Sequence, residues 1–313
     1  MRNQPARGHR GGGIDCRRAA IAGLPDDRVA AVQAFELSRR VPRGGVVVAV
    51  THEGGTAATN EALRAAAAAG ATTILITVSD RSPAAALAGR VLSTEEQDQS
   101  WCHTVGYLSP LVVGACLHGA IRDAPPPPEA MARQVAAGAD PPAAEGMAAK
   151  FASTDRLLVV GSGTDYAAAR ELALKVEEGA RMPAVAHELE TIRHGHLAAA
   201  SKRTGLVMVL TDAEGRGAAL LDRAASVLRS AGELGMPAAA IAAADVGGAP
   251  ERSIATAGWQ SVTLEPGLPR PVAAILGSAV PLQLLTERLA RARGTNPDTI
   301  GREDPRQAAA ASA

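Results

Sequence analysis

Short apolar runs alternate along the chain with longer segments of helical pattern, and glycine-containing turns join them. In the first half the runs of strand length are residues 46–50, 72–78 and 90–93. In the second half they are residues 157–160, 184–185, 206–210, 238–242 and 261–264. Apolar strands that alternate with helices at close spacing predict parallel sheets joined by right-handed crossovers. The pattern therefore predicts an α/β protein with two parallel sheets.

The same pattern predicts helices, and the proline clusters between them indicate the domain boundaries. The helices cover residues 26–39, 57–69, 83–88, 103–122, 165–180, 216–231 and 271–292. Proline clusters at 125–128 and 141–142 interrupt the pattern and indicate a linker. We expect a poorly defined segment at 1–25, a first domain at 26–124, a proline-rich linker with one helix at 125–150, a second domain at 151–293 and a C-terminal tail at 294–313. Both domains begin alike, which suggests an internal duplication.

Composition narrows the function classes. The 32 basic and 32 acidic residues balance, so charge favours neither a nucleic-acid nor a membrane-surface partner. The three cysteines lie far apart, which argues against disulfides and zinc and favours a reducing cytoplasm. The apolar run at 272–285 contains Pro281 and Gln283 and is typical of a core helix. The basic first 13 residues lack a following apolar segment, so no secretory signal is expected. No cofactor is expected either.

Two strand-to-helix turns are candidates for anion binding. They are THEGGT at 51–56 and GSGT at 161–164. Backbone N–H groups at the start of a helix attract an anion, and glycines let it approach closely. Glu53 would repel an anion unless it points away. The alternative is a plain turn capped by a threonine.

Candidate acid–base residues follow in the second half. Lys175 and Glu178 are three residues apart and share one helix face. His194 lies in RHGHL at 193–197 and suits proton transfer near neutral pH. The alternatives are a surface ion pair and a solvated histidine. The spacing of His187, Glu188, His194 and His196 matches no standard zinc pattern, so no metal is expected. GSGTDY lacks the third glycine of a dinucleotide fingerprint.

In order and spacing, these motifs resemble the tandem sugar isomerase (SIS) domain family, including the isomerase half of glucosamine-6-phosphate synthase. The resemblance rests on THEGGT, LITVSDRSPAAALAGRVL at 75–92, GSGTDY, ALKVEE at 173–178, RHGHL and GTNPDTIGR at 294–302. It implies two three-layer αβα domains with parallel sheets. The first domain is expected to lack its first strand, because no apolar run precedes Gly11-Gly12-Gly13. The resemblance also implies a homodimer. It does not extend to a glutaminase domain.

The resemblance implies that the chain binds a phosphorylated sugar or amino sugar and acts as an aldose–ketose isomerase or a sugar-phosphate deaminase-like enzyme. Glu178 would be the base, Lys175 would stabilise charge and His194 would open the ring. The expected substrate-binding residues are Thr51, His52, Gly54, Gly55, Thr56, Gly161, Gly163, Thr164 and Arg302. Arg302 falls near the family's lysine, and an arginine cannot form a Schiff base. The alternative is a non-catalytic sugar-phosphate-binding SIS protein.

Overall fold

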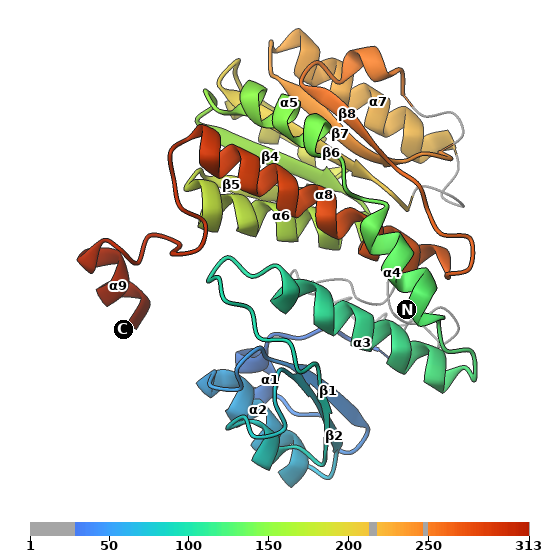
Figure 1. The fold of residues 1–313 in the computed structure, drawn as a ribbon, viewed down its shortest axis with the longest axis vertical. Coiled ribbons are helices and arrows are strands. Elements are labelled where there is room, and N and C mark those ends of the chain that lie inside the picture. Colours follow the sequence, from blue (N-terminus) through green and yellow to red (C-terminus); the bar gives the residue numbers. More distant parts are fainter. Residues whose placement is uncertain (1–28, 213–217, 247–249, 313) are drawn as a thin grey trace, which may run out of the picture. The chain divides into compact units, whose positions relative to one another are not determined.

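The computed structural model describes residues 29–212, 218–246 and 250–312 (Figure 1). The chain divides into two compact units, one ending at Ser93 and the other beginning at Thr94. The predicted N-terminal segment, residues 1–25, lies outside the described residues, and so does the stretch before Gly11-Gly12-Gly13 where the first strand is expected to be lacking.

The first unit contains a three-stranded parallel sheet in the order β1-β2-β3. Its elements are α1 (Ala34–Arg39), β1 (Val46–Val50), α2 (Ala57–Ala68), β2 (Thr72–Thr77), η1 (Ala85–Leu87) and β3 (Arg90–Ser93). Leu63 of α2 and Leu75 of β2 are fully buried and anchor its small core. Among the described residues β1 pairs only with β2, so its outer edge is open.

The predicted helix over residues 26–39 is wrong in its first part. Among its described residues only Ala34–Arg39 are helical, and residues 29–33 have no regular structure. Gln33 has extended dihedral angles and gives no side-chain cap. The β-branched Val29 and Val32 fit a helix less well than an extended chain. The strands and α2 agree with the prediction to within one residue at each end.

The second unit is built on a five-stranded parallel sheet in the order β5-β4-β6-β7-β8. Its strands are β4 (Arg156–Gly161), β5 (Ala184–Glu188), β6 (Thr204–Leu210), β7 (Ala238–Ala243) and β8 (Gly258–Val262). Its α-helices are α3 (Val105–Ile121), α4 (Pro128–Ala136), α5 (Pro141–Phe151), α6 (Thr164–Ala180), α7 (Ala218–Glu233), α8 (Arg270–Ala292) and α9 (Pro305–Ser312). Three short 3₁₀ turns are η2 (Thr191–Arg193), η3 (His196–Ala199) and η4 (Arg252–Ile254).

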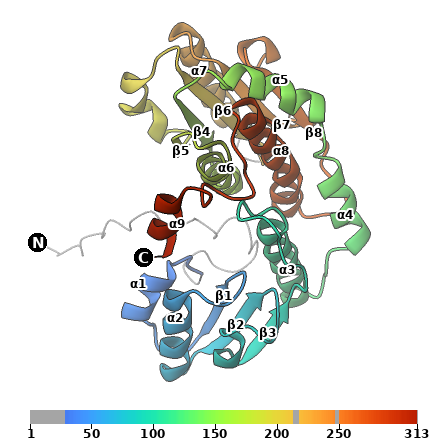
Figure 2. The ribbon, with the colours of Figure 1, turned by 60° about the vertical axis from the view of Figure 1, so that its left-hand side comes forward.

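Helices cover both faces of this sheet. Leu157 and Val159 point toward one face, where they join a core with α5, α6 and α8. Leu158 and Val160 point toward the other, which α7 covers. Figures 1 and 2 show these layers. The unit is therefore a three-layer αβα structure, as the resemblance to the SIS family implied, and its sheet is parallel, as the apolar pattern of its strands predicted.

The proline-rich segment 125–150 differs from the predicted linker with one helix. It contains two helices, α4 and α5, and both pack in the second unit. Met147 and Phe151 of α5 are fully buried in the core around α6 and α8. Pro128 and Pro141 stand in the first turns of these helices, where the missing N–H needs no partner. The prolines start helices here, whereas the sequence interpretation treated them as breaks.

The long helix α8 is apolar enough, by length and composition, to cross a membrane. However, 67% of its apolar window is buried inside the protein. It packs along α6, α5 and α4, which is the environment of a core helix.

Candidate functional site

The turn between β4 and α6 is built by two glycines. A Cβ on Gly161 would collide with the backbone of Asp165 in the first turn of the helix. Gly163 has φ +62°, a conformation that L-residues rarely adopt, and it caps α6. The chain therefore turns tightly from the carboxyl end of β4 into a 17-residue helix.

The first turn of α6 is fixed to the end of β6 by a buried carboxylate. Asp165 is 2% exposed and accepts hydrogen bonds from the Thr211 N–H (3.0 Å), the Thr211 hydroxyl (2.6 Å) and the Asp212 N–H (3.1 Å). Burial raises the pKa of Asp165 to about 6, although these donors oppose the shift. Thr164 is only 1% exposed. A substrate-binding role for Gly161, Gly163 and Thr164 stays a prediction.

Lys175 lies between two carboxylates near the other end of α6. Its ammonium nitrogen is 2.6 Å from Glu178 Oε2 and 3.7 Å from Glu171 Oε1, and its side chain is 5% exposed. Burial disfavours the charged ammonium, but Glu171 and Glu178 outweigh it and raise the pKa of Lys175. We call Glu171, Lys175 and Glu178 the α6 charge cluster. The structure thus brings the predicted pair together and makes it more than a surface ion pair.

Glu171 is the member of the cluster that sequence reasoning missed. Its side chain is 15% exposed. Burial raises the pKa of its carboxyl group, against the attraction of Lys175. The signal was present, because Glu171 stands four residues before Lys175 and therefore shares its helix face.

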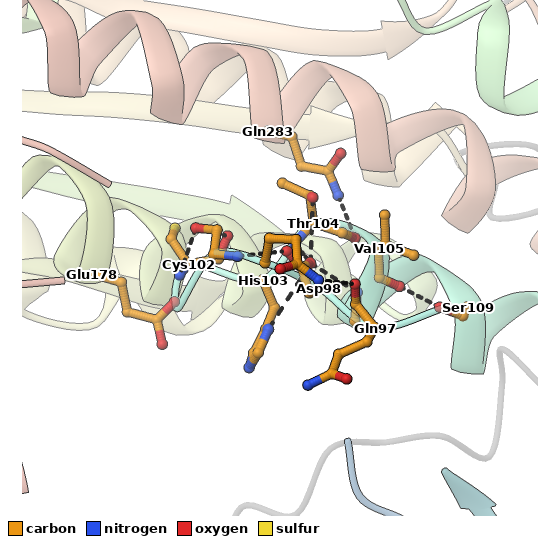
Figure 3. A network of polar contacts seen from close by, with 12 residues as sticks. Gln97, Asp98, Cys102, His103, Thr104, Val105, Ser109, Glu178 and Gln283 are labelled. Carbon is orange, nitrogen blue, oxygen red and sulfur yellow. Dashed lines mark hydrogen bonds and ion pairs between the residues drawn. The ribbon is translucent and has the colours of Figure 1, made fainter. Parts of the chain in front are cut away.

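A loop that precedes α3 packs against this end of α6. The thiol of Cys102 lies 3.9 Å from the backbone oxygen of Lys175, and Figure 3 shows Cys102 beside Glu178. Asp98 holds the loop by accepting hydrogen bonds from the N–H groups of Ser100, Thr104 and Gly106. Burial opposes this charge, but these donors lower the pKa of Asp98. The loop is therefore fixed next to the charge cluster.

The C-terminal tail reaches the same place. Thr295 donates to the backbone oxygen of Gly179 (2.7 Å), directly after Glu178. The Trp101 N–H donates to the Asp298 oxygen (3.0 Å), which joins the tail to the loop. The Arg302 guanidinium lies over the Trp101 ring, 3.5 Å from its centroid. Arg302 therefore lies in the same unit as the charge cluster. The tail that carries it and the loop that it stacks on both contact the C-terminal end of α6.

His194 lies at the opposite end of α6. It follows β5, whose last residue is level with Gly161 in the sheet, and the neighbouring His196 stacks on His187 of β5 with ring centroids 4.0 Å apart. Glu178 is 14 residues beyond the start of α6, roughly 20 Å along its axis. His194 itself is 72% exposed and contacts Glu190 at 3.2 Å. One chain therefore does not bring His194 and Glu178 together.

The THEGGT turn lies in the first unit, between β1 and α2. Gly54 has φ +73°, and a Cβ there would clash with Ser82, so packing explains this glycine. Thr56 is the N-cap residue of α2, but its side chain makes no capping hydrogen bond, so the alternative of a threonine cap is not realised. Glu53 is exposed. Phosphate binding by Thr51, His52, Gly54, Gly55 and Thr56 stays a prediction.

In the described part of the chain, no three His, Cys, Asp or Glu side chains are grouped to hold a metal ion. Burial, together with the neighbouring His196, lowers the pKa of His187. The paired rings of His187 and His196 are therefore not accompanied by a third ligand within those residues.

Comparison with known proteins shows that the segment carrying the charge cluster matches a domain family. Residues 136–243, which run from the end of α4 through β7, match the SIS domain family. This segment is a SIS domain. It includes Lys175, Glu178 and His194. No curated protein sequence matched the chain significantly.

Solved structures share the SIS fold over most of the chain. The C-terminal domain of glucosamine-fructose-6-phosphate aminotransferase from Francisella tularensis is 20% identical, with a TM-score of 0.68, over 85% of this chain and 77% of that one. Glucosamine-6-phosphate deaminase from Thermotoga maritima is 19% identical, with a TM-score of 0.65, over 86% and 78%. Tagatose-6-phosphate ketose/aldose isomerase from Escherichia coli is 22% identical, with a TM-score of 0.59, over 82% and 70%. At this identity the likeness shows the fold.

Proposed function

We propose that this protein is a sugar-phosphate isomerase, or a related aminosugar-phosphate isomerase or deaminase, that uses the α6 charge cluster. The observation that carries the proposal is the buried Lys175–Glu178 pair, with its 2.6 Å contact, inside a SIS domain. Proteins of the same fold are named for reactions on sugar and amino-sugar 6-phosphates. A phosphorylated sugar or amino sugar is therefore the proposed substrate.

Glu178 is the proposed base. Its side chain is 24% exposed, so a carbohydrate can reach it while Lys175 behind it stays shielded from water. Aldose–ketose isomerisation moves a proton between C1 and C2 through an enediolate, which needs one carboxylate to carry the proton. Lys175 stays protonated at neutral pH because its pKa is raised, with the flanking carboxylates outweighing its burial. Its charge steadies Glu178 and the negative charge that develops on the substrate.

His194 would open the sugar ring from a second copy of the chain. It is exposed and lies at the other end of α6 from Glu178, so a site that uses both residues needs two chains. A symmetric dimer satisfies this requirement twice, because each chain supplies one residue to each site. The proposal therefore includes a homodimer. The phosphate would bind at the THEGGT turn through Thr51, Thr56 and the backbone N–H groups around Gly54 and Gly55.

The test is turnover of fructose-6-phosphate and glucosamine-6-phosphate, measured by coupled assay, with binding measured by calorimetry. Glu178→Gln removes the base and should reduce kcat by 100-fold or more, on the order expected for general-base catalysis, with little change in binding. Glu177→Gln is the matched control, because Glu177 is the exposed neighbour on the same helix. Equal activity of the Glu178→Gln and Glu177→Gln variants would refute the role of Glu178.

A second function, sugar-phosphate binding without catalysis, is favoured by Arg302. An arginine keeps the positive charge of the family's lysine but cannot form an imine or readily release a proton. The same experiment separates the two functions. Binding of either sugar phosphate without turnover in the wild type supports the binding protein, and absence of binding refutes both.

A further inference from the structure

We propose that Trp101 is a positioning residue that holds Arg302 beside the C-terminal end of α6, the helix that carries the charge cluster, ready to bind the oxygen atoms of a sugar phosphate. This inference rests on the proposed function for its ligand. It names a residue, Trp101, that neither the sequence motifs nor the family match assigns. Trp101 and Arg302 both belong to the second unit.

The indole of Trp101 supports the guanidinium directly. The central carbon of the guanidinium is 3.5 Å from the ring centroid, which is stacking distance. The backbone of Trp101 also donates to the Asp298 oxygen, so the loop and the C-terminal tail are joined at two points. Arg302 in turn donates its backbone N–H to the Thr299 oxygen (2.9 Å). The tail thus fixes the backbone of Arg302, and Trp101 of the loop fixes its guanidinium.

The guanidinium has no acidic partner among the described residues. Its Nε atom is buried and makes no hydrogen bond there, and no ion pair involves Arg302. The neighbouring carboxylate, Glu303, pairs with Arg181. A guanidinium carries five N–H donors arranged to bind oxygen atoms in pairs. Stacking on Trp101 fixes the guanidinium without using its donors, so the N–H groups other than the buried Nε are available to a ligand.

The position of this pair connects it to the charge cluster. Trp101 is followed by Cys102, whose thiol contacts the backbone of Lys175, and the tail before Arg302 contacts Gly179, next to Glu178. A cation held in place before binding loses less conformational entropy when the ligand arrives. Trp101 therefore raises affinity through Arg302 without touching the reacting atoms.

The first experiment tests the contact itself. In a Trp259→Phe background, Trp101 is the only tryptophan, and acrylamide quenching reports its accessibility. Replacing Arg302 by alanine uncovers one of the two indole faces and should raise the quenching constant roughly twofold. An unchanged quenching constant would overturn the contact, whether or not the protein binds a sugar.

The second experiment tests the role with a double-mutant cycle on fructose-6-phosphate and glucosamine-6-phosphate binding. Trp101→Ala and Arg302→Ala should each weaken binding about tenfold, and the double variant should be no weaker than Arg302→Ala. Trp101→Phe keeps a stacking ring and should restore most of the affinity, and the urea midpoint should stay unchanged. Multiplicative losses would overturn positioning, because Trp101 would then act without Arg302. If the wild type binds neither sugar phosphate, the proposed function and this ligand role both fail, while the quenching result still decides the contact.

Discussion

Replacing Lys175 by methionine tests whether the α6 charge cluster stabilises the fold. The substitution keeps the buried length of the side chain and removes its charge. At an effective dielectric constant of about 20, a charge pair at the observed 2.6 Å has a gross attraction of about 6 kcal/mol. Desolvation offsets much of this, but removing one partner leaves Glu171 and Glu178 partly buried and unpaired. Such losses cost about 3–5 kcal/mol, and the partial exposure of both carboxylates favours the lower end, about 3 kcal/mol.

The loss of stability in the Lys175→Met variant should depend on pH, and the pKa of Glu171 sets the direction. Burial raises the pKa of Glu171 above its ordinary 4.5 against the attraction of Lys175, so removing Lys175 raises that pKa further. A carboxyl group with a raised folded-state pKa contributes stability below pH 4.5, and this contribution is lost as pH rises through the folded-state value. The difference in unfolding free energy between the wild type and the variant should therefore be largest at pH 7 and shrink toward pH 4.5.

The assay is urea unfolding of the wild type and the variant between pH 4.5 and pH 7.5. Lys150→Met is the matched control, because Lys150 is exposed on α5, and it should change stability by less than about 0.5 kcal/mol. Adding Glu171→Gln to the Lys175→Met variant should recover part of the loss. A deficit below about 1 kcal/mol at pH 7, or one independent of pH, would refute the reasoning.

Three further predictions concern the same unit. Gly161→Ala should destabilise the protein by about 2 kcal/mol or more in thermal unfolding, whereas Gly146→Ala, in an open part of α5, should be neutral or stabilising by up to about 1 kcal/mol. Because burial raises the pKa of Asp165 to about 6 from 3.8, its contribution to stability is full below pH 3.8 and is lost as pH rises through 6. Asp165→Asn should therefore flatten the pH profile of the urea midpoint over that range, and an unchanged slope would contradict the assignment. Burial raises the pKa of the Cys102 thiol to about 11, so at pH 8 peptide mapping should find it alkylated far more slowly than the exposed Cys116, and equal rates would contradict this.

Local pattern in the sequence predicted most of the secondary structure. The apolar runs of β1 and β4 could be recognised as strands without any partner, because the pattern is a property of the chain itself. Burial followed only for β4, whereas Val46, Val48 and Val50 of β1 are exposed among the described residues. The i,i+3 spacing placed Lys175 and Glu178 on one helix face for the same reason. Proline was less informative, since Pro128 can end a helix or begin one, and packing against α8 decided which.

The tertiary structure decided which candidate residues meet. Sequence proximity suggested that Glu178 and His194 act together. However, α6 starts at the carboxyl end of β4 and places Glu178 near its far end, whereas β5 brings the chain back to the carboxyl end of the sheet before His194. Conversely, Trp101 and Arg302 are far apart in the sequence and stack in space. The sequence by itself determined most of the strands and helices and the charge pair, because these depend on contacts within a few residues. Only the fold determined the surroundings of that pair, because they depend on where a loop and a tail distant in the chain come to lie.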